Sequence, residues 1–187
     1  CELRVSAPKR LMTRYADYIT PWGGHMFHLH IRYRSRDGGG SCETARQYIV
    51  REGSFAKRGD KVLWIHSLHM PEWASGASAP AYWRAAEGRF SRANARTALM
   101  IEFALPRELS LDAQKSLALN FAQSVSTMGR EEASPSERLP VTMALHSGHG
   151  RNPHIHMLVS TSINDGVSRP EHRWFKRFLP ERTADGG

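Results

Sequence analysis

Alternating apolar and basic residues mark the first predicted strand, "FHLHIRYR" at residues 27–34. Phe27, Leu29, Ile31 and Tyr33 occupy every second position, with histidine or arginine between them. Because successive side chains of a strand point to opposite faces, the segment predicts a strand with one apolar and one basic face. We expect the apolar face to be buried against the core.

Three apolar runs predict strands, and the first of them is predicted to be buried. Residues 98–105, "ALMIEFAL", end at Pro106, whereas residues 141–146, "VTMALH", are followed closely by residues 154–161, "HIHMLVST". The short loop between the last two runs predicts an antiparallel pair. Residues 58–77 show neither a helical nor a strand period, and we predict irregular structure there.

Four segments carry helical signals. Ser41 and Ser110 precede two of them at the N-cap position, and Pro80 opens another. The segment after Ser110 has the apolar spacing of an amphipathic helix. The predicted spans are 42–52 ending near Gly53, 80–94, 111–128, and a short last helix carrying Trp174, Phe175 and Phe178.

The order of these elements predicts an α+β fold. We expect a mainly antiparallel central sheet flanked by helices, which we place on one side of the sheet. The 187 residues suit a single domain. Residues 1–25 lack a clean period and run into "GGHM", so we treat them as an N-terminal extension of uncertain status, a cloning scar or an upstream leader. The domain is assigned to residues 26–187.

The charge balance narrows the class of partner. The formal net charge is +8, which is typical of proteins that bind a polyanion, nucleic acid first, although solubility alone also explains it. The two cysteines, Cys1 and Cys42, give no disulfide framework and no thiolate zinc site. No apolar run is long enough to span a bilayer and no signal peptide is evident, so we expect a cytoplasmic protein without membrane insertion.

The segment "HSGHGRNPHIHMLVS" concentrates four histidines. His154 and His156 project from the same face of a strand, and His146 ends the strand with which it pairs. Three imidazoles on one hairpin form an open metal site with positions left for water or substrate. His149, in the glycine-flanked loop, is the rival third ligand.

A second H-x-H pair, His28 and His30, lies on the first predicted strand. Histidines on a solvated strand face are also a simpler explanation for either pair. We interpret His28 and His30 as part of the basic strand face, and leave open whether they reach the metal site.

The segment "LHSGHGRNPHIHMLVS" resembles the three-histidine motif of HUH endonucleases, in the form found in MobA/MobL-type plasmid mobilisation relaxases. "NPHIH" is its specific part. Further segments resemble that family in the same order, namely "YIVREG", "IEFALPREL", "INDGVSRP" and "WFKRF". The resemblance extends from about Met26 to the C-terminus.

This resemblance implies a metal-dependent enzyme that nicks one strand at a plasmid transfer origin and binds the origin as single-stranded DNA. A tyrosine attacks the phosphodiester and stays attached to the 5′ phosphate, and the reverse reaction rejoins the strand. It also implies Mn²⁺ or Mg²⁺ on the three histidines, whereas ligand softness alone favours zinc, nickel or copper. Zinc remains a candidate for tight binding.

Tyr48 lies in "TARQYIVREG", the segment similar to the one that carries the family's catalytic tyrosine. Its helical spacing is equally compatible with a core tyrosine. Tyr15 and Tyr18 precede the first strand, whereas the family tyrosine follows it. We therefore expect Tyr48 to be the nucleophile.

Three charged residues complete the candidate site. Arg46 and Arg51 flank Tyr48 and are candidates for DNA phosphate contacts, or simply part of a solvated basic face. Glu102 is a candidate for orienting a ligand histidine, with an ordinary surface glutamate as the alternative. Trp64, Trp73 and Trp174 can stack on bases or pack in the core.

The resemblance also implies missing parts and partners. Relaxase domains continue with at least one further helix, so we expect residues 26–187 to be C-terminally truncated and any fused primase domain to be absent. Auxiliary mobilisation proteins are expected partners. Two alternatives stay open: a rolling-circle replication initiator or transposase of the HUH class, and a non-catalytic metal-dependent DNA-binding module.

Overall fold

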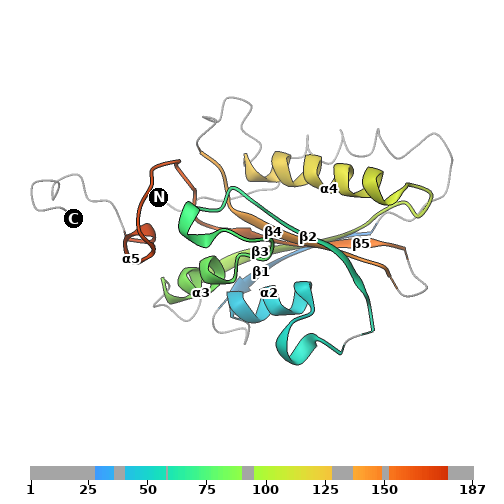
Figure 1. Cartoon of the computed structure of the whole chain (residues 1–187), viewed down its shortest axis with the longest axis horizontal. Helices are drawn as coiled ribbons and strands as arrows, with labels where there is room; N and C mark the ends of the chain where they lie inside the picture. Colours follow the sequence, from blue (N-terminus) through green and yellow to red (C-terminus); the bar gives the residue numbers. More distant parts are fainter. Residues whose placement is uncertain are drawn as a thin grey trace, which may run out of the picture.

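The computed structural model describes residues 28–35, 41–57, 59–89, 95–127, 137–148 and 152–176. In these ranges the chain forms a five-stranded sheet with the order β1-β3-β5-β4-β2 (Figure 1). All four neighbouring pairs are antiparallel. The strands are β1 (Leu29–Ser35), β2 (Val62–Leu68), β3 (Arg96–Ala104), β4 (Val141–His146) and β5 (His154–Ser160).

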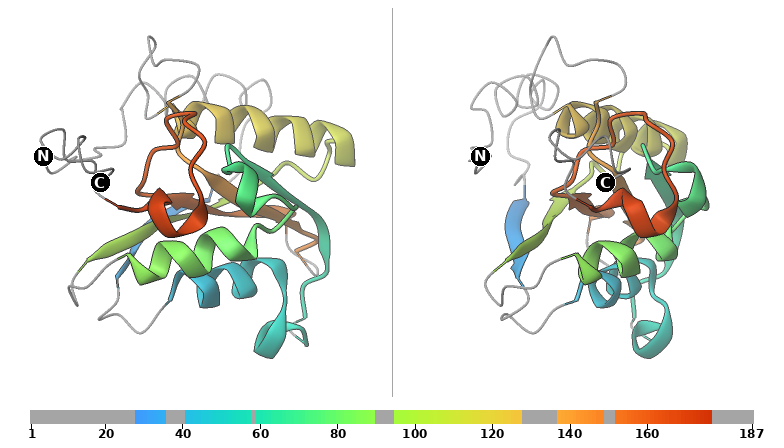
Figure 2. Two further views of the ribbon diagram at one scale, coloured as in Figure 1. Left: turned by 60° about the vertical axis from the view of Figure 1, so that its left-hand side comes forward. Right: turned by 90° about the vertical axis from the view of Figure 1, so that its left-hand side faces the viewer.

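Helices pack on both faces of this sheet. The α-helices in the described ranges are α2 (Cys42–Val50), α3 (Pro80–Gly88), α4 (Leu111–Ser126) and α5 (Glu171–Trp174), with short 3-10 turns η1 (Gly53–Phe55) and η2 (Glu72–Ala74). Figures 1 and 2 show α4 on one face and α2 with α3 on the other. The α+β class and the antiparallel sheet are confirmed, but the expectation of helices on one side is wrong.

The central strands explain this two-sided cover. All of β4 is buried, and so is β5 after its first residue, so both of their faces need apolar neighbours. Ile155 and Met157 face α4, whereas Ala144 and Leu158 face α2 and α3. The segments of β4 and β5 are apolar runs without strict alternation, a pattern typical of strands that are buried on both faces.

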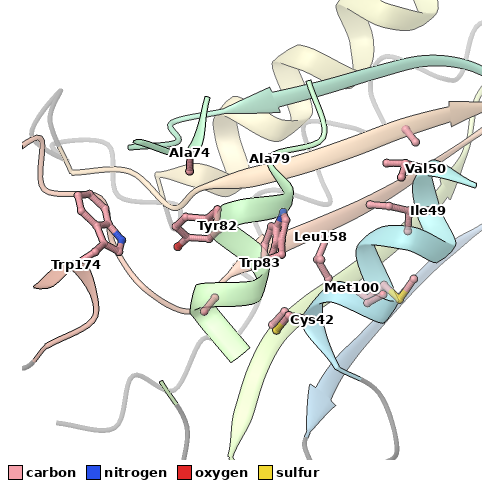
Figure 3. Close-up of a cluster of buried hydrophobic side chains, with 14 residues drawn as sticks. Cys42, Ile49, Val50, Ala74, Ala79, Tyr82, Trp83, Met100, Leu158 and Trp174 are labelled. Carbon is pink, nitrogen blue, oxygen red and sulfur yellow. The ribbon is translucent and has the colours of Figure 1, made fainter. Parts of the chain in front are cut away.

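The cluster on the α2 and α3 face includes Tyr82 and Trp83 (Figure 3). Both rings are fully buried, and both polar atoms have partners. The Tyr82 hydroxyl lies 2.7 Å from Ser160 Oγ, and Trp83 Nε1 donates to Thr142 Oγ1 at 2.8 Å. Tyr82 is therefore a core residue, and its burial raises the pKa of its hydroxyl.

Two edge strands depart from the predictions. Residues 58–77, expected to be irregular, contain β2, which pairs with β4 through a register shift between Val62 and Trp64. Most of β2 is half-buried, so no clean alternation marked it. In β1 the apolar face is less covered than expected, with Ile31 and Tyr33 each 38% exposed. An edge position explains this, since α4 packs mainly against β4 and β5.

The helix boundaries follow the capping residues. Ser41 Oγ accepts a hydrogen bond from the Thr44 amide at 2.8 Å, and Ser110 Oγ accepts one from the Ala113 amide at 3.3 Å. Both N-cap predictions are therefore confirmed. Pro80 opens α3 as predicted, but α3 ends at Gly88, and residues 90–94 lie outside the described ranges.

Two further predictions concern residues that lie partly outside the described ranges. Phe178 and the extension at residues 1–25 are not among the described residues, while Trp174 is buried at the end of α5. Among the helices in the described ranges, none combines the length and apolarity that a membrane crossing requires.

Candidate metal centre and nucleophile

Three histidines meet at one end of the hairpin formed by β4 and β5. His146 is opposite His154 in the register of the two strands, and His156 lies two residues further along β5. One nitrogen from each imidazole can be chosen so that all three lie within 4.8 Å of one another. The expected clustering of His146, His154 and His156 is therefore present.

Hydrogen bonds indicate which ring nitrogen of His146 and of His154 carries the hydrogen and which has the lone pair. His146 Nε2 lies 2.6 Å from the Ile49 carbonyl oxygen, which only accepts, so Nε2 carries the hydrogen and Nδ1 has the lone pair. His154 Nδ1 lies 3.3 Å from the Asn152 carbonyl oxygen, which leaves Nε2. Lone pairs held in this way are the donor set that a divalent transition metal needs.

The third imidazole, that of His156, lies next to the carboxylate of Glu102. The two residues are directly opposite in the β3–β5 register, and Glu102 Oε2 lies 3.5 Å from His156 Nδ1. That buried nitrogen has no hydrogen-bond partner in the described residues, and Glu102 is the carboxylate beside it. This geometry favours the orienting role of Glu102 over that of an ordinary surface residue.

Burial keeps two of the three imidazoles neutral. Desolvation is the main reason why the pKa of His146 falls to about 4 and that of His156 to about 2, and the neighbouring histidines and Arg51 lower both values further. His146 is fully buried and His156 is 2% exposed. A neutral imidazole is the form that binds a metal, so these ligands do not need to lose protons at neutral pH.

Tyr48 lies beside this cluster on α2, which packs across β4 and β5. Its ring centroid is 5.5 Å from that of His156 and 5.6 Å from that of Phe55, both in edge-to-face geometry. Of the other tyrosines, Tyr82 is buried in the core and Tyr33 lies on the edge strand β1. Tyr15 and Tyr18 lie outside the described residues.

Arg51 links the tyrosine to the histidines. It is the C-cap residue of α2, with φ of 58°, and its side chain is 9% exposed. Nη1 donates to the Tyr48 carbonyl oxygen at 2.7 Å, and the guanidinium carbon lies 4.8 Å from the centre of the Tyr48 ring. Nη2 lies 3.2 Å from His146 Nδ1. Arg51 is thus at the centre of the candidate site.

Asp60 is a site residue that the sequence did not indicate. Its Oδ2 lies 3.7 Å from Arg51 Nη2 and 3.8 Å from His154 Nε2. It lies in the segment between η1 and β2 and has no motif of its own. Only the tertiary approach of this segment to the histidine hairpin brings it into the site.

Arg46 does not join this group. Its guanidinium is buried and pairs with Glu43 at 2.7 Å and with Glu52 at 2.8 Å. These two carboxylates already compensate its charge, so we no longer assign Arg46 to a DNA phosphate. Arg46 instead connects Glu43, in the first turn of α2, with Glu52, which follows the end of the helix.

The remaining histidine candidates either lie apart from the cluster of His146, His154 and His156 or fall outside the described residues. His149 is not among the described residues. His30 shares the sheet face of the site, because it is opposite Glu102, which is opposite His156. Both His28 and His30 are exposed, and neither belongs to the group of potential metal ligands.

Comparison with known proteins identifies the family. The sequence model of the MobA/MobL family matches residues 51–178. The chain belongs to the MobA/MobL family. The match begins after Tyr48, so the assignment to MobA/MobL rests on Arg51, the histidine hairpin and the segments around them, and does not itself identify the nucleophile.

Two curated relatives each match most of the chain. A protein named mobilization protein A, from Escherichia coli, is 45% identical over 162 residues, which are 87% of this chain and 21% of that protein. A protein named 43 kDa relaxation protein, from Salmonella typhimurium, is 34% identical over 157 residues, 81% of this chain and 38% of that protein. The chain thus spans about a fifth of the first relative and under two fifths of the second.

A solved structure shares the fold. It is described as the molecular basis of vancomycin resistance transfer in Staphylococcus aureus, and it aligns with a TM-score of 0.58 and 20% identity. The alignment covers 73% of this chain and 70% of that one. The agreement supports the antiparallel sheet with its helices.

Proposed function

We propose that this chain is the strand-nicking domain of a plasmid mobilisation relaxase, with Tyr48 as its nucleophile. Membership of the MobA/MobL family and the names of the two relatives support the general role. The observation that carries the chemistry is the position of the Tyr48 ring. Its centroid is 5.5 Å from that of His156, which is one of the three potential metal ligands. The substrate is single-stranded DNA at a plasmid transfer origin.

The proposed step is a transesterification. The Tyr48 oxygen forms a bond to the scissile phosphorus, and the bond from phosphorus to the 3′ oxygen breaks. The tyrosine proton passes to solvent, and the departing 3′ oxygen takes up a proton to become a free hydroxyl. The 5′ phosphate remains on Tyr48, and rejoining is the reverse reaction.

His146, His154 and His156 are the residues that would hold a divalent ion. When bound there, it supplies positive charge next to the phosphate oxygens, where negative charge develops. Mn²⁺ and Mg²⁺ are the proposed working ions, because phosphate oxygens complete the set of ligands, and Zn²⁺ is a tight competitor. Glu102 orients His156, and Arg51 offers a guanidinium to the DNA.

The DNA contacts beyond this site follow from charge and exposure. The net charge of +8 favours binding to the phosphate backbone. Trp174 is buried in the core cluster, which removes it as a base-stacking candidate, whereas Trp73 and Trp64 are half-buried and each packs against a core cluster. Trp64, on the edge strand β2, stacks on His66 with ring centroids 5.2 Å apart and is the tryptophan we assign to base contact. Auxiliary mobilisation proteins are the proposed protein partners.

The chemistry of the cut ends tests this proposal. The protein is incubated with Mn²⁺ and a single-stranded oligonucleotide carrying the transfer origin of the plasmid that encodes it. Transesterification gives a 3′ end that a polymerase extends and a 5′ end that resists a 5′ exonuclease and carries the protein, which is seen as a gel shift that protease reduces. Cut DNA with a free 5′ phosphate would indicate hydrolysis by water and would overturn the proposal.

A further inference from the structure

Arg51 competes for a lone pair that the metal site needs. The Ile49 carbonyl holds the hydrogen of His146 on Nε2, so Nδ1 is the nitrogen of this ring that can bind an ion. Arg51 Nη2 donates to that same nitrogen at 3.2 Å. One lone pair cannot accept this hydrogen and coordinate a metal ion at the same time.

Charge adds to the competition. Besides His146, Arg51 Nη2 lies 3.7 Å from Asp60 Oδ2, and that oxygen is 3.8 Å from His154 Nε2. The corner of the guanidinium therefore lies among groups that face the ion position. A divalent ion placed there would repel the guanidinium, because both are positively charged. The repulsion is strong because the Arg51 side chain is only 9% exposed, so water screens the two charges weakly.

We propose that Arg51 is a built-in cation that occupies the His146 lone pair when the ion is absent and transfers to the scissile phosphate when ion and DNA bind. Transfer to DNA rests on the function proposed above, whereas competition with the ion does not. Its contact with Asp60 and its bond to the Tyr48 carbonyl keep the side chain close to the site during the exchange.

The exchange couples the ion to the DNA. While Arg51 is on His146, the ion must displace it, and this lowers the affinity for the ion. A phosphate that accepts the guanidinium removes this cost, so DNA raises ion affinity, and by reciprocity the ion raises DNA affinity. The site then assembles fully only when a strand is in place.

A calorimetric titration of the metal-free protein with Mn²⁺ tests the competition, and it requires neither DNA nor a measurement of enzyme activity. We expect Arg51→Met to bind Mn²⁺ roughly tenfold more tightly than the parent, because both a hydrogen bond and a charge are removed. Arg51→Lys, which keeps the charge, should lie between the two. Arg84→Met, an exposed arginine on α3, should match the parent. Unchanged or weaker binding by a folded Arg51→Met protein overturns the proposal.

Coupling is tested by repeating the titration with a single-stranded origin oligonucleotide. Phosphate oxygens contribute to ion binding in every variant, so the informative quantity is the difference between variants. The oligonucleotide should tighten Mn²⁺ binding more in the parent than in Arg51→Met. An equal gain in both proteins overturns the transfer of Arg51 to phosphate, whether or not Tyr48 proves to be the nucleophile.

A measurement on the parent alone covers the case in which the variants do not fold. Long-range ¹H–¹⁵N spectra of the metal-free protein report which imidazole nitrogen of His146 carries the hydrogen. The proposal requires the hydrogen on Nε2 and a hydrogen-bonded Nδ1. The opposite tautomer contradicts it.

Discussion

Acidification should destabilise the metal-free protein through His146 and His156. Burial lowers the pKa of His146 to about 4 and that of His156 to about 2, whereas an imidazole in the unfolded chain has a pKa of about 6.5. Between these values the unfolded chain binds more protons than the folded one. The free energy of unfolding therefore falls as the pH drops below about 6.5, and the stability is fully present above it.

The expected size follows from the same values. Going from about pH 7.5 to about pH 5.5, the unfolded chain becomes almost fully protonated at both positions, while the folded chain remains neutral there. Each histidine then costs about 1.3 kcal/mol, and the pair costs about 2.6 kcal/mol. Most carboxylates titrate below this window, so they contribute little to the difference.

Urea unfolding at the two pH values, with a chelator present, measures this loss. His156→Gln keeps a polar side chain that does not titrate, and its loss should be about 1.3 kcal/mol smaller than that of the parent. Because each protein is compared with itself at two pH values, a general destabilisation by the substitution cancels. An equal loss in parent and variant, or greater stability at the lower pH, would refute the assignment of buried neutral imidazoles.

Three further predictions concern the ligands, the α4 cap and the DNA. Alanine at His146, His154 or His156 should abolish Mn²⁺ binding in a calorimetric titration, whereas His149→Ala should retain it; the opposite result for His146 and His149 would reverse the ligand assignment. Ser110→Ala removes the N-cap hydrogen bond of α4 and should lower the free energy of unfolding by about 1 kcal/mol in urea titrations, with no change counting against the cap. Affinity for single-stranded DNA should fall steeply with salt, by about 0.7 logarithmic units per tenfold increase in salt for each phosphate neutralised, and an affinity that stays flat would contradict the electrostatic account.

The sequence predicted the features that depend on local patterns. Apolar runs predicted β3, β4 and β5, and serine caps predicted where α2 and α4 begin. The spacing of His154 and His156 placed both side chains on one face of a strand. His146 could be added because a short loop joins the two strands of the hairpin.

The features that were missed depend on tertiary contacts. The edge strand β2 is half-buried and irregular in register, so its sequence shows no period. Asp60 lies near His154 because the loop before β2 passes beside the histidine hairpin. Arg51 lies near His146 because α2 ends beside the same hairpin. Arg46 and Arg51 were indistinguishable in sequence, yet one pairs with glutamates and the other with the histidine cluster.

The most direct test of this account is the identity of the residue that becomes attached to DNA. The parent protein is incubated with Mn²⁺ and a single-stranded origin oligonucleotide, digested with protease, and the peptide that carries DNA is identified by mass spectrometry. We predict that the DNA is on Tyr48, and that Tyr48→Phe binds the oligonucleotide almost as the parent does but forms neither adduct nor nick, because it lacks the attacking oxygen. DNA attached to any other residue, or an adduct formed by Tyr48→Phe, would contradict the assignment.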